Sequence, residues 1–197
     1  MTPNETAIRH LRKADPKLGE VITRIGPFTL DQQSNDFERF VDIIVGQQLS
    51  GKAADAIFNK VKSVCRASKL TPAVLEKRTD EELRGAGLSA AKVKAVRSLT
   101  EHVKSRKLQI DKLASFDDAT VIELITSVKG MGPWSAQMYL MFVLNRLDVF
   151  PVRDLGIQKG MMKLYGKRID EKRMLKISEK WRPYRTIASW YLWRSLE

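Results

Sequence analysis

Two glycines and one carboxylate have the residue types and the spacing for chemistry on a phosphate-linked substrate. Gly130 and Gly132 form a Gly-x-Gly turn that opens an apolar helix, and Asp154 follows 22 residues after Gly132, just past the turn at Pro151. A helix that starts after such a turn presents backbone N–H groups and a partial positive charge, which suit it to phosphate. A carboxylate can stabilise developing positive charge or orient water. The segment therefore predicts a phosphate grip followed by a reactive acid.

The charge of the chain favours an extended polyanion as its partner. Its 197 residues carry 35 Lys and Arg against 23 Asp and Glu, a formal net charge of +12. Such a balance points to nucleic acid, an anionic membrane or another acidic partner, and it carries no information about fold. The longest apolar run, Met138–Leu144, is far too short to span a bilayer. We expect no membrane association.

Cysteine and histidine content limits the possible cofactors. The single cysteine, Cys65, excludes a disulfide framework, a four-cysteine iron–sulfur cluster and a thiolate zinc site. With only His10 and His102, the sequence also argues against transition-metal catalysis. No secretory signal follows the N-terminus. We expect an intracellular protein, in the cytoplasm and nucleoid, or in the nucleus if the source is eukaryotic.

Helical periodicity dominates the elements that must position these groups. One apolar stripe repeats at helical spacing from Phe37 to Val45, and a second from Val93 to Val103. The basic residues of the second stretch are predicted to point outward: Lys92, Lys94, Arg97 and Lys104. From Trp134 to Leu144 apolar residues surround the helix, which predicts a central, buried one. Since no segment alternates apolar and polar residues, the predicted fold class is all-α, with about ten short helices.

The chain contains an internal repeat of the glycine turn. Leu83–Val93 aligns without gaps on Val128–Met138, and both segments place Gly-x-Gly before small residues that enter a helix. Glycine turns commonly end one helix and begin the next, so a purely structural role stays open for the first copy. The residues downstream of the second copy make a structural role alone less favoured there.

Several motifs together resemble the helix-hairpin-helix DNA glycosylases, and within them the 3-methyladenine, or alkylated-base, branch. The motifs are Val128–Ala136 with Asp154, Ile43–Ser50, Leu83–Ser89, Trp181–Arg185 and Trp190–Trp193. The resemblance implies two helical lobes with a DNA-binding cleft between them, acting as a single catalytic unit over residues 1–197. We expect approximate lobes at 36–115 and at 1–35 plus 116–197, with the helix-hairpin-helix at about 120–145.

The resemblance implies that the enzyme flips a damaged base out of duplex DNA, because a stacked base cannot be reached. The hairpin would grip phosphate through Gly130 and Gly132, and Ser135 would add a hydroxyl. The wedge that fills the gap would be Gln48, or alternatively Leu49. Helix capping and hydrogen bonding between the lobes is an alternative role for the two glutamines, above all for Gln47.

The base pocket is predicted to use aromatic faces. An alkylated purine is positively charged, and indole rings attract it by stacking and cation–π forces. The main candidates are Trp134 and Trp193, although Trp193 could instead be a core residue. Further candidates for the pocket are Met138, Tyr184 and Phe28. Trp190 and Tyr191 are expected in the core.

Asp154 is the predicted catalytic residue, because cleavage of an N-glycosidic bond develops positive charge on the sugar. Its alternative role is to cap the helix that begins near Leu155, and the two roles are compatible. Bifunctional members of the superfamily carry a nucleophilic lysine four residues after the first hairpin glycine. Trp134 stands there, and Lys129 precedes the glycines. We therefore expect a monofunctional enzyme that leaves an abasic site.

The predicted partner is double-stranded DNA that contains alkylated bases, bound by a monomer without an iron–sulfur cluster. A monovalent cation on the backbone carbonyls of Thr126 and Val128 is a further expectation from the resemblance. Two alternatives stay open. One is a non-catalytic helix-hairpin-helix protein that only binds DNA, and the other is a glycosylase for an oxidised or deaminated base.

Overall fold

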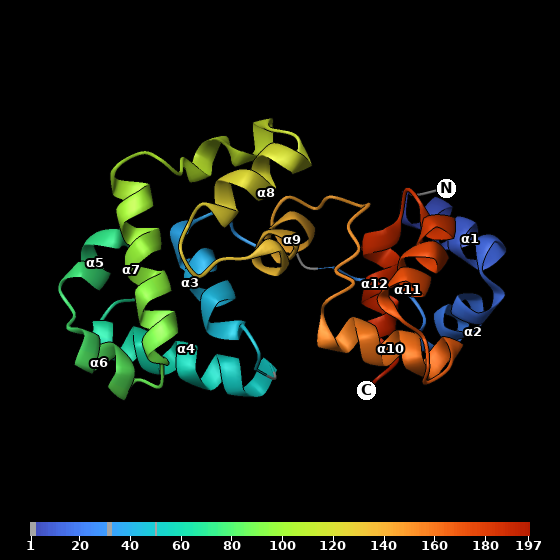
Figure 1. Ribbon diagram of the computed structural model, residues 1–197, viewed down its shortest axis with the longest axis horizontal. Helices are drawn as coiled ribbons and strands as arrows, with labels where there is room; N and C mark the ends of the chain where they lie inside the picture. Colours follow the sequence, from blue (N-terminus) through green and yellow to red (C-terminus); the bar gives the residue numbers. More distant parts are fainter. Residues whose placement is uncertain (1–2, 31–32, 50) are drawn as a thin grey trace. The chain divides into compact units, whose positions relative to one another are not determined.

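The computed structural model describes residues 3–30, 33–49 and 51–197. Within these ranges every regular element is a helix and no strand occurs, which confirms the all-α prediction. Among the described residues, no helix has the length and the apolar character needed to cross a bilayer. The chain divides into two compact units (Figure 1). We call residues 33–144 the middle unit and residues 3–30 with 145–197 the terminal unit.

The terminal unit is formed by segments from both ends of the chain. Its elements are α1 (Pro3–Ala14), α2 (Pro16–Ile25), α10 (Leu155–Tyr165), α11 (Glu171–Ser178), η2 (Glu179–Trp181) and α12 (Arg185–Arg194). Helix α12 packs on both α2 and α10, so segments far apart in the sequence lie side by side. The hydroxyl of Tyr191 donates to the carbonyl of Gly26 at 2.8 Å and ties α12 to the end of α2.

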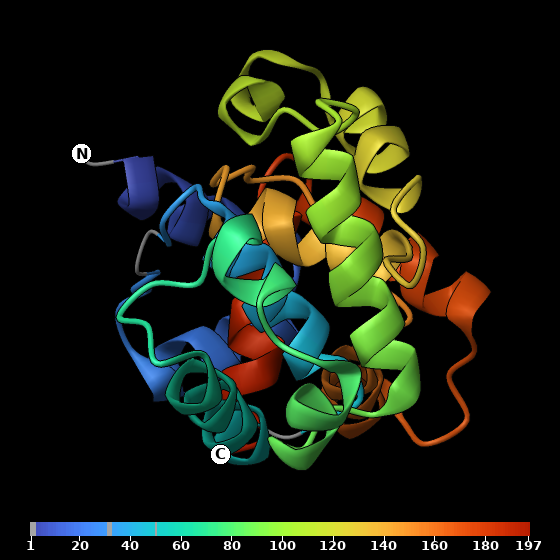
Figure 2. The same ribbon diagram turned by 90° about the vertical axis from the view of Figure 1, so that its left-hand side faces the viewer.

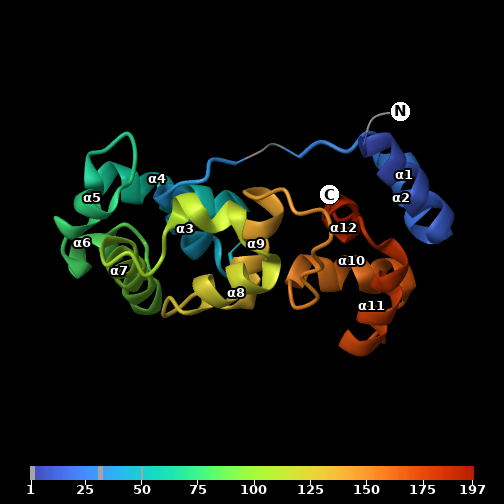
Figure 3. The ribbon, with the colours of Figure 1, turned by 90° about the horizontal axis from the view of Figure 1, so that it is seen from above.

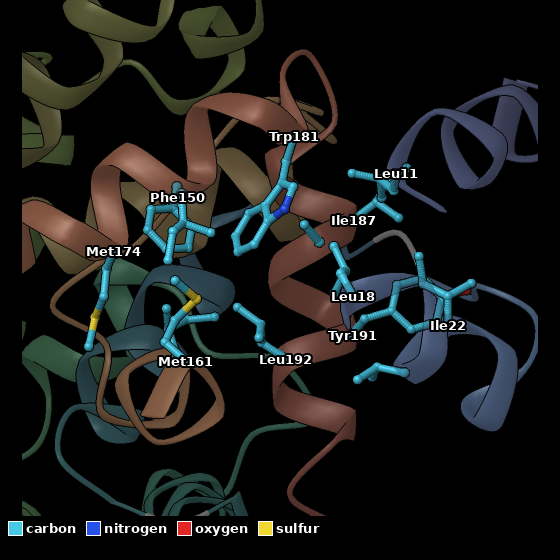
Figure 4. Close-up of a cluster of buried hydrophobic side chains, with 14 of the residues drawn as sticks. Leu11, Leu18, Ile22, Phe150, Met161, Met174, Trp181, Ile187, Tyr191 and Leu192 are labelled. Carbon is cyan, nitrogen blue, oxygen red and sulfur yellow. The ribbon is translucent and has the colours of Figure 1, made fainter. Parts of the chain in front are cut away.

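The core of the terminal unit is built around Trp181 and Tyr191, both with 0% exposure (Figure 4). Tyr191 is therefore a core residue as predicted, and Trp190 packs against the same cluster. One carboxylate, Asp15, is buried beside it and accepts hydrogen bonds from the hydroxyl of Tyr165 at 2.9 Å and the indole of Trp181 at 3.2 Å. These partners compensate the cost of burying the acid.

The middle unit surrounds α3. Its elements are α3 (Phe37–Gly46), α4 (Gly51–Cys65), α5 (Pro72–Glu76), α6 (Asp80–Gly85), α7 (Ala90–Lys104), η1 (Ile110–Ser115), α8 (Asp118–Thr126) and α9 (Pro133–Phe142). Helix α3 packs against α4, α7 and α9, and α8 packs on α9 (Figures 2 and 3). Six of the ten residues of α9 are buried, which confirms the prediction of a central helix.

The division differs from the predicted lobes, which placed residues 116–144 with the two termini. Helices α8 and α9 belong to the middle unit because α9 packs on α3 and α8 packs on α9. Two hydrogen bonds from the residue that follows α3 strengthen this assignment: the side-chain nitrogen of Gln47 donates to the carbonyl of Gly130 at 2.9 Å and to the hydroxyl of Ser135 at 3.0 Å. Periodicity identified the helices but could not show which neighbours they pack against.

Most of the described α-helices begin at a side chain that accepts a hydrogen bond from the backbone N–H three residues later. These N-caps are Asp15, Asp36, Thr71, Thr79, Ser89, Asp117, Asp154 and Asp170. Each such cap contributes about 1 kcal/mol of stability. Helix α9 is an exception, since its N-cap is Gly132 and has no side chain that could accept.

Candidate active site and nucleic-acid interface

The turn between α8 and α9 needs glycine at Gly130 for packing. This residue has a φ of +89°, a conformation that side-chain-bearing residues rarely adopt. A Cβ atom placed there would lie 2.6 Å from the Cβ of Ala95 on α7, well inside van der Waals contact. Gly130 therefore lets the hairpin approach α7 closely.

Gly132 is placed differently from Gly130. Its φ of −104° is accessible to any residue, and a Cβ atom there would meet no heavy atom within 4 Å. Neither backbone strain nor packing explains this glycine. Pro133 follows in the first turn of α9 and fits a position where a backbone N–H has no helical partner. The start of α9 thus offers open space beside a helix N-terminus, the arrangement that accepts an anion.

Ser135 and Gln47 form a hydrogen-bonded pair inside the middle unit. The side-chain nitrogen of Gln47 donates to the carbonyl of Gly130 at 2.9 Å and to the hydroxyl of Ser135 at 3.0 Å. Gln47 is therefore a structural residue, as its alternative role predicted: it joins two segments that the predicted lobes separated and that the structure places in one unit. Ser135 is only 1% exposed, and its place is inside the hairpin rather than on an outer phosphate-facing surface.

The predicted wedge residues lie in an exposed turn that follows α3. Gln48 has a φ of +59° and is exposed, and Leu49 is 39% exposed. The N–H of Leu49 donates to the carbonyl of Gly46 at 3.2 Å and closes the turn. Ser50, the last residue of the predicted motif, lies outside the described residues. The turn presents both candidates to solvent, as a wedge requires.

The prediction that Lys92 points outward was wrong. Its ammonium group donates to the carbonyls of Val45 at 2.7 Å and Gln47 at 2.9 Å, so it spans from α7 to the end of α3. Burial lowers the pKa of Lys92. Lys94, two residues later, is exposed as predicted. Helical periodicity assigned Lys92 to the polar side of the helix, but its long stem reaches back to a neighbouring helix end.

The first copy of the glycine turn, at Gly85 and Gly87, has a structural explanation. Gly87 has a φ of +107°, and a Cβ atom there would lie 3.1 Å from Ile57 Cγ1 on α4. The helix that follows begins at Ser89, whose hydroxyl accepts from the N–H of Lys92 at 3.2 Å. A side chain of the protein therefore occupies this helix start.

Asp154 caps α10 and is held by two donors. Its Oδ1 atom accepts from the N–H of Ile157 at 2.8 Å and from the indole N–H of Trp193 at 2.7 Å. The capping role considered for Asp154 is thus confirmed, and the carboxylate stays partly exposed. A helix N-terminus favours the negative charge of this group. The arrangement fixes the carboxylate in one orientation.

Gly156 allows Trp193 to reach Asp154. A Cβ atom on Gly156 would lie 2.6 Å from Trp193 Cδ1, 2.8 Å from its Nε1 and 3.0 Å from Asp154 Oδ1. One turn later, a Cβ atom on Gly160 would lie 2.9 Å from the carbonyl of Leu192. The two glycines bring α10 against α12. Sequence reasoning missed this pair, although the spacing of two glycines four residues apart on a predicted helix was visible.

The predicted pocket residues are distributed over both units. Trp193, Tyr184 and Phe28 belong to the terminal unit, where all three pack partly buried against its core. The Tyr184 ring contacts His10 edge-on, and the Phe28 ring contacts Trp190 in the same way.

The other two pocket candidates belong to the middle unit, in the first turns of α9. Trp134 is partly buried and Met138 is 7% exposed. The pocket that these residues are predicted to form stays a prediction. A hydrogen bond joins two of the predicted site residues, Asp154 and Trp193.

Several basic residues of the terminal unit form ion pairs with acids of their own unit. Arg182 and Arg185 both contact Asp148, at 2.6 Å and 2.7 Å. The hydrogen bond from Arg182 also lowers the pKa of Glu179. Arg153, next to the predicted catalytic acid, lies 3.4 Å from Glu171. The Trp181–Arg185 motif therefore contributes two guanidinium groups to an internal network.

The backbone expected to hold a monovalent cation lies at the C-terminal end of α8. Thr126 is the last residue of this helix, and the carbonyl of Val128 accepts from the N–H of Met131 at 3.0 Å. Carbonyls at a helix C-terminus suit a cation, because they lack helical donors and carry partial negative charge. For other metals, no group of three His, Cys, Asp or Glu side chains within the described ranges is arranged to bind an ion.

Residues 41–183 match the HhH-GPD superfamily of base excision DNA repair proteins, and the chain belongs to this superfamily. The membership confirms the resemblance that the hairpin and Asp154 indicated. DNA-3-methyladenine glycosylase 1 of Schizosaccharomyces pombe is 33% identical over 193 residues, covering 94% of this chain and 85% of that protein.

Solved structures of similar proteins agree with this membership. A DNA-3-methyladenine glycosidase from Bacillus halodurans is 38% identical with a TM-score of 0.81, covering 98% of this chain and 89% of that one. The 3-methyladenine DNA glycosylase of S. pombe in complex with abasic DNA is 31% identical with a TM-score of 0.89, and 96% of each chain is covered.

Proposed function

We propose that the protein is a monofunctional DNA-3-methyladenine glycosylase, which flips alkylated purines out of duplex DNA and hydrolyses their N-glycosidic bond. Its membership in the superfamily and its similarity to two proteins named for this activity support the proposal. The observation that carries it is the carboxylate of Asp154, held by a helix N-terminus and by the indole of Trp193. A DNA-binding module without catalysis would not need this arrangement.

Asp154 acts on the sugar. As the glycosidic bond breaks, positive charge develops on the sugar ring, and a fixed carboxylate stabilises it and orients the attacking water. Both donors contact Oδ1 and fix the orientation of the carboxylate. The carboxylate therefore does not need to rotate during the reaction. An alkylated purine is already a good leaving group, so no dedicated general acid is required.

Recognition of the base relies on charge and aromatic surface. Alkylation at ring position 3 or 7 leaves the purine cationic and electron-poor, and indole faces attract such a ring. Trp134 and Trp193 are the proposed stacking residues, with Met138, Tyr184 and Phe28 as neighbours. Since Trp193 also donates to Asp154, it would link base recognition to the orientation of the catalytic acid.

The partner is DNA, bound mainly through its phosphates. Gly130 and Gly132 form the proposed phosphate grip, and the net charge of +12 makes binding dependent on salt. Gln48 or Leu49 fills the gap left by the flipped base. The carbonyls of Thr126 and Val128 hold a monovalent cation that would support the hairpin. The protein is proposed to act as an intracellular monomer without an iron–sulfur cluster.

A panel of single-lesion duplexes tests the substrate. We expect release of 3-methyladenine or another alkylated purine, and no release of 8-oxoguanine or uracil. Preferential release of an oxidised or deaminated base would mean that this base, and not an alkylated purine, is the substrate. Binding to every duplex without any release would support the non-catalytic alternative.

Borohydride trapping tests the monofunctional mechanism. Trp134 stands where a lyase would carry its nucleophilic lysine, so no Schiff base should form with the sugar. We expect no covalent protein–DNA adduct during base release. A trapped adduct would contradict the hydrolytic mechanism.

A further inference from the structure

The carbonyl groups at the end of α3 are bound by a lysine from another helix. Lys92 Nζ lies 2.7 Å from the carbonyl oxygen of Val45 and 2.9 Å from that of Gln47. Carbonyls at a helix C-terminus lack helical donors and carry partial negative charge, so a cation stabilises them. Burial lowers the pKa of Lys92, because the ammonium gives up part of its hydration in this position. The side chain is therefore committed to the end of α3.

The residue that follows the second carbonyl is strained. Gln48 has a φ of +59°, which is rare for a residue with a side chain and costs on the order of 1–3 kcal/mol. Such a conformation persists only where its surroundings impose it. Lys92 fixes the carbonyl of Gln47 on one side of Gln48, and the bond from the N–H of Leu49 to the carbonyl of Gly46 closes the turn around it.

The same turn is connected to the hairpin. While its backbone carbonyl binds Lys92, the side chain of Gln47 donates to the carbonyl of Gly130 and to the hydroxyl of Ser135. A continuous series of hydrogen bonds thus runs from α7 through the turn after α3 to the start of α9. All of its members lie in the middle unit.

We propose that Lys92 is a positioning residue for insertion into DNA: it holds the Gly46–Leu49 turn in the strained conformation that presents Gln48, and Gln47 fixes this turn to the phosphate-gripping hairpin. This inference rests on the proposed function, since it assumes that Gln48 enters the DNA stack. Lys92 then acts through Gln48, and it is not one of the lysines that neutralise phosphate. Its contribution to DNA binding comes from holding the strained turn in place, and not from a contact of its own charge with the DNA backbone.

A double-mutant cycle tests the inference without requiring catalysis. The probe is a duplex with an abasic-site analogue beside 2-aminopurine, whose fluorescence at saturating protein reports occupation of the gap. The proteins are the wild type, Lys92→Met, Gln48→Ala and the double variant. Lys94→Met is the matched control, because it removes an exposed lysine from the same helix.

We expect Lys92→Met to lose the wild-type fluorescence change almost as completely as Gln48→Ala, and the double variant to be no worse than Gln48→Ala. Lys94→Met should keep the full change. The slope of log affinity against log salt should stay the same in Lys92→Met, since removal of a true phosphate contact lowers it by about one. Lys92→Gln, which keeps a side-chain N–H donor group but loses the charge, enters the same cycle if Lys92→Met does not fold.

Any of three results with the variants would overturn the inference: additive losses in the double variant, a reduced salt slope in Lys92→Met, or a full fluorescence change in Lys92→Met. A wild-type protein that causes no fluorescence change would also overturn it, because the turn would then not insert. Base release from alkylated duplexes is measured separately. Failure of this inference is therefore distinguishable from failure of the proposed glycosylase activity.

Discussion

The two glycine turns of the middle unit share one sequence pattern, an apolar residue and a basic residue followed by Gly-x-Gly, but they have different surroundings. In each turn one glycine has a positive φ and packs against a neighbouring helix: Gly87 against Ile57, and Gly130 against Ala95. The turns differ at the helix start that follows. The hydroxyl of Ser89 caps α7, whereas α9 begins at Gly132, which brings no side chain and faces open space.

This difference shows that a glycine motif alone does not make a phosphate site. Close packing accounts for one glycine in each turn and leaves two in open space: Gly85, which ends α6, and Gly132, which begins α9. A helix start that is already capped has less to offer an anion, because its first N–H groups have an acceptor. The comparison assigns the phosphate grip to the second turn and a structural role to the first.

The largest effect is expected from Gly130→Ala. The new methyl group would collide with the Cβ of Ala95 and would sit at a φ of +89°, so we predict a loss of about 2–4 kcal/mol in the free energy of unfolding. Urea denaturation measures this change. Combining the substitution with Ala95→Gly should recover part of the loss, and a purely additive result would mean that the predicted collision does not occur.

Gly87→Ala should destabilise the protein less. The atom nearest to the new Cβ would be a side-chain carbon of Ile57 at 3.1 Å. Because this side chain can shift, the main energetic cost comes from placing alanine at a positive φ. We predict a loss of about 1–2 kcal/mol, with unchanged affinity for undamaged duplex DNA. The same urea series and a binding titration provide the measurements. A fall in DNA affinity beyond that caused by lost stability would give the first turn a role in binding.

Gly132→Ala should have the smallest effect on stability and the clearest effect on DNA. Alanine fits the backbone at this position, and replacement of glycine at an N-cap costs about 0.5–1 kcal/mol. The methyl group would, however, occupy the open space at the start of α9, and we predict several-fold weaker binding to duplex DNA. Fluorescence anisotropy titration measures this affinity.

Gly85→Ala is the matched control for Gly132→Ala. Gly85 is also the glycine of its turn whose Cβ would meet nothing within 4 Å, and it ends α6 rather than beginning a helix. This variant should bind DNA as the wild type does. Equal affinities for the two variants would remove the distinction between the turns.

The sequence predicted the parts of the fold that depend on local patterns. Apolar spacing identified the helices, the all-apolar surface of Trp134–Leu144 indicated the buried α9, and the position of Asp154 after a proline turn indicated both a cap and a reactive acid. These properties follow from periodicity and from chemistry at neighbouring positions.

The parts that were missed depend on contacts between distant segments. Lys92 was assigned to solvent because periodicity describes the side of a helix and not the reach of a long side chain. The role of Gly156 depends on the indole of Trp193, which lies on another helix. The unit to which α8 and α9 belong was also misassigned, since it is decided by packing on α3.

The central claim is that Asp154 carries the chemistry, and Asp154→Asn tests it most directly. Asparagine keeps the shape and an oxygen that can accept from Ile157 and Trp193, so the cap is preserved while the charge is lost. In single-turnover assays on an alkylated duplex, we predict that base release slows by about 10²–10⁴-fold, with unchanged affinity for undamaged DNA. Base release at the wild-type rate by a folded Asp154→Asn protein would contradict the account.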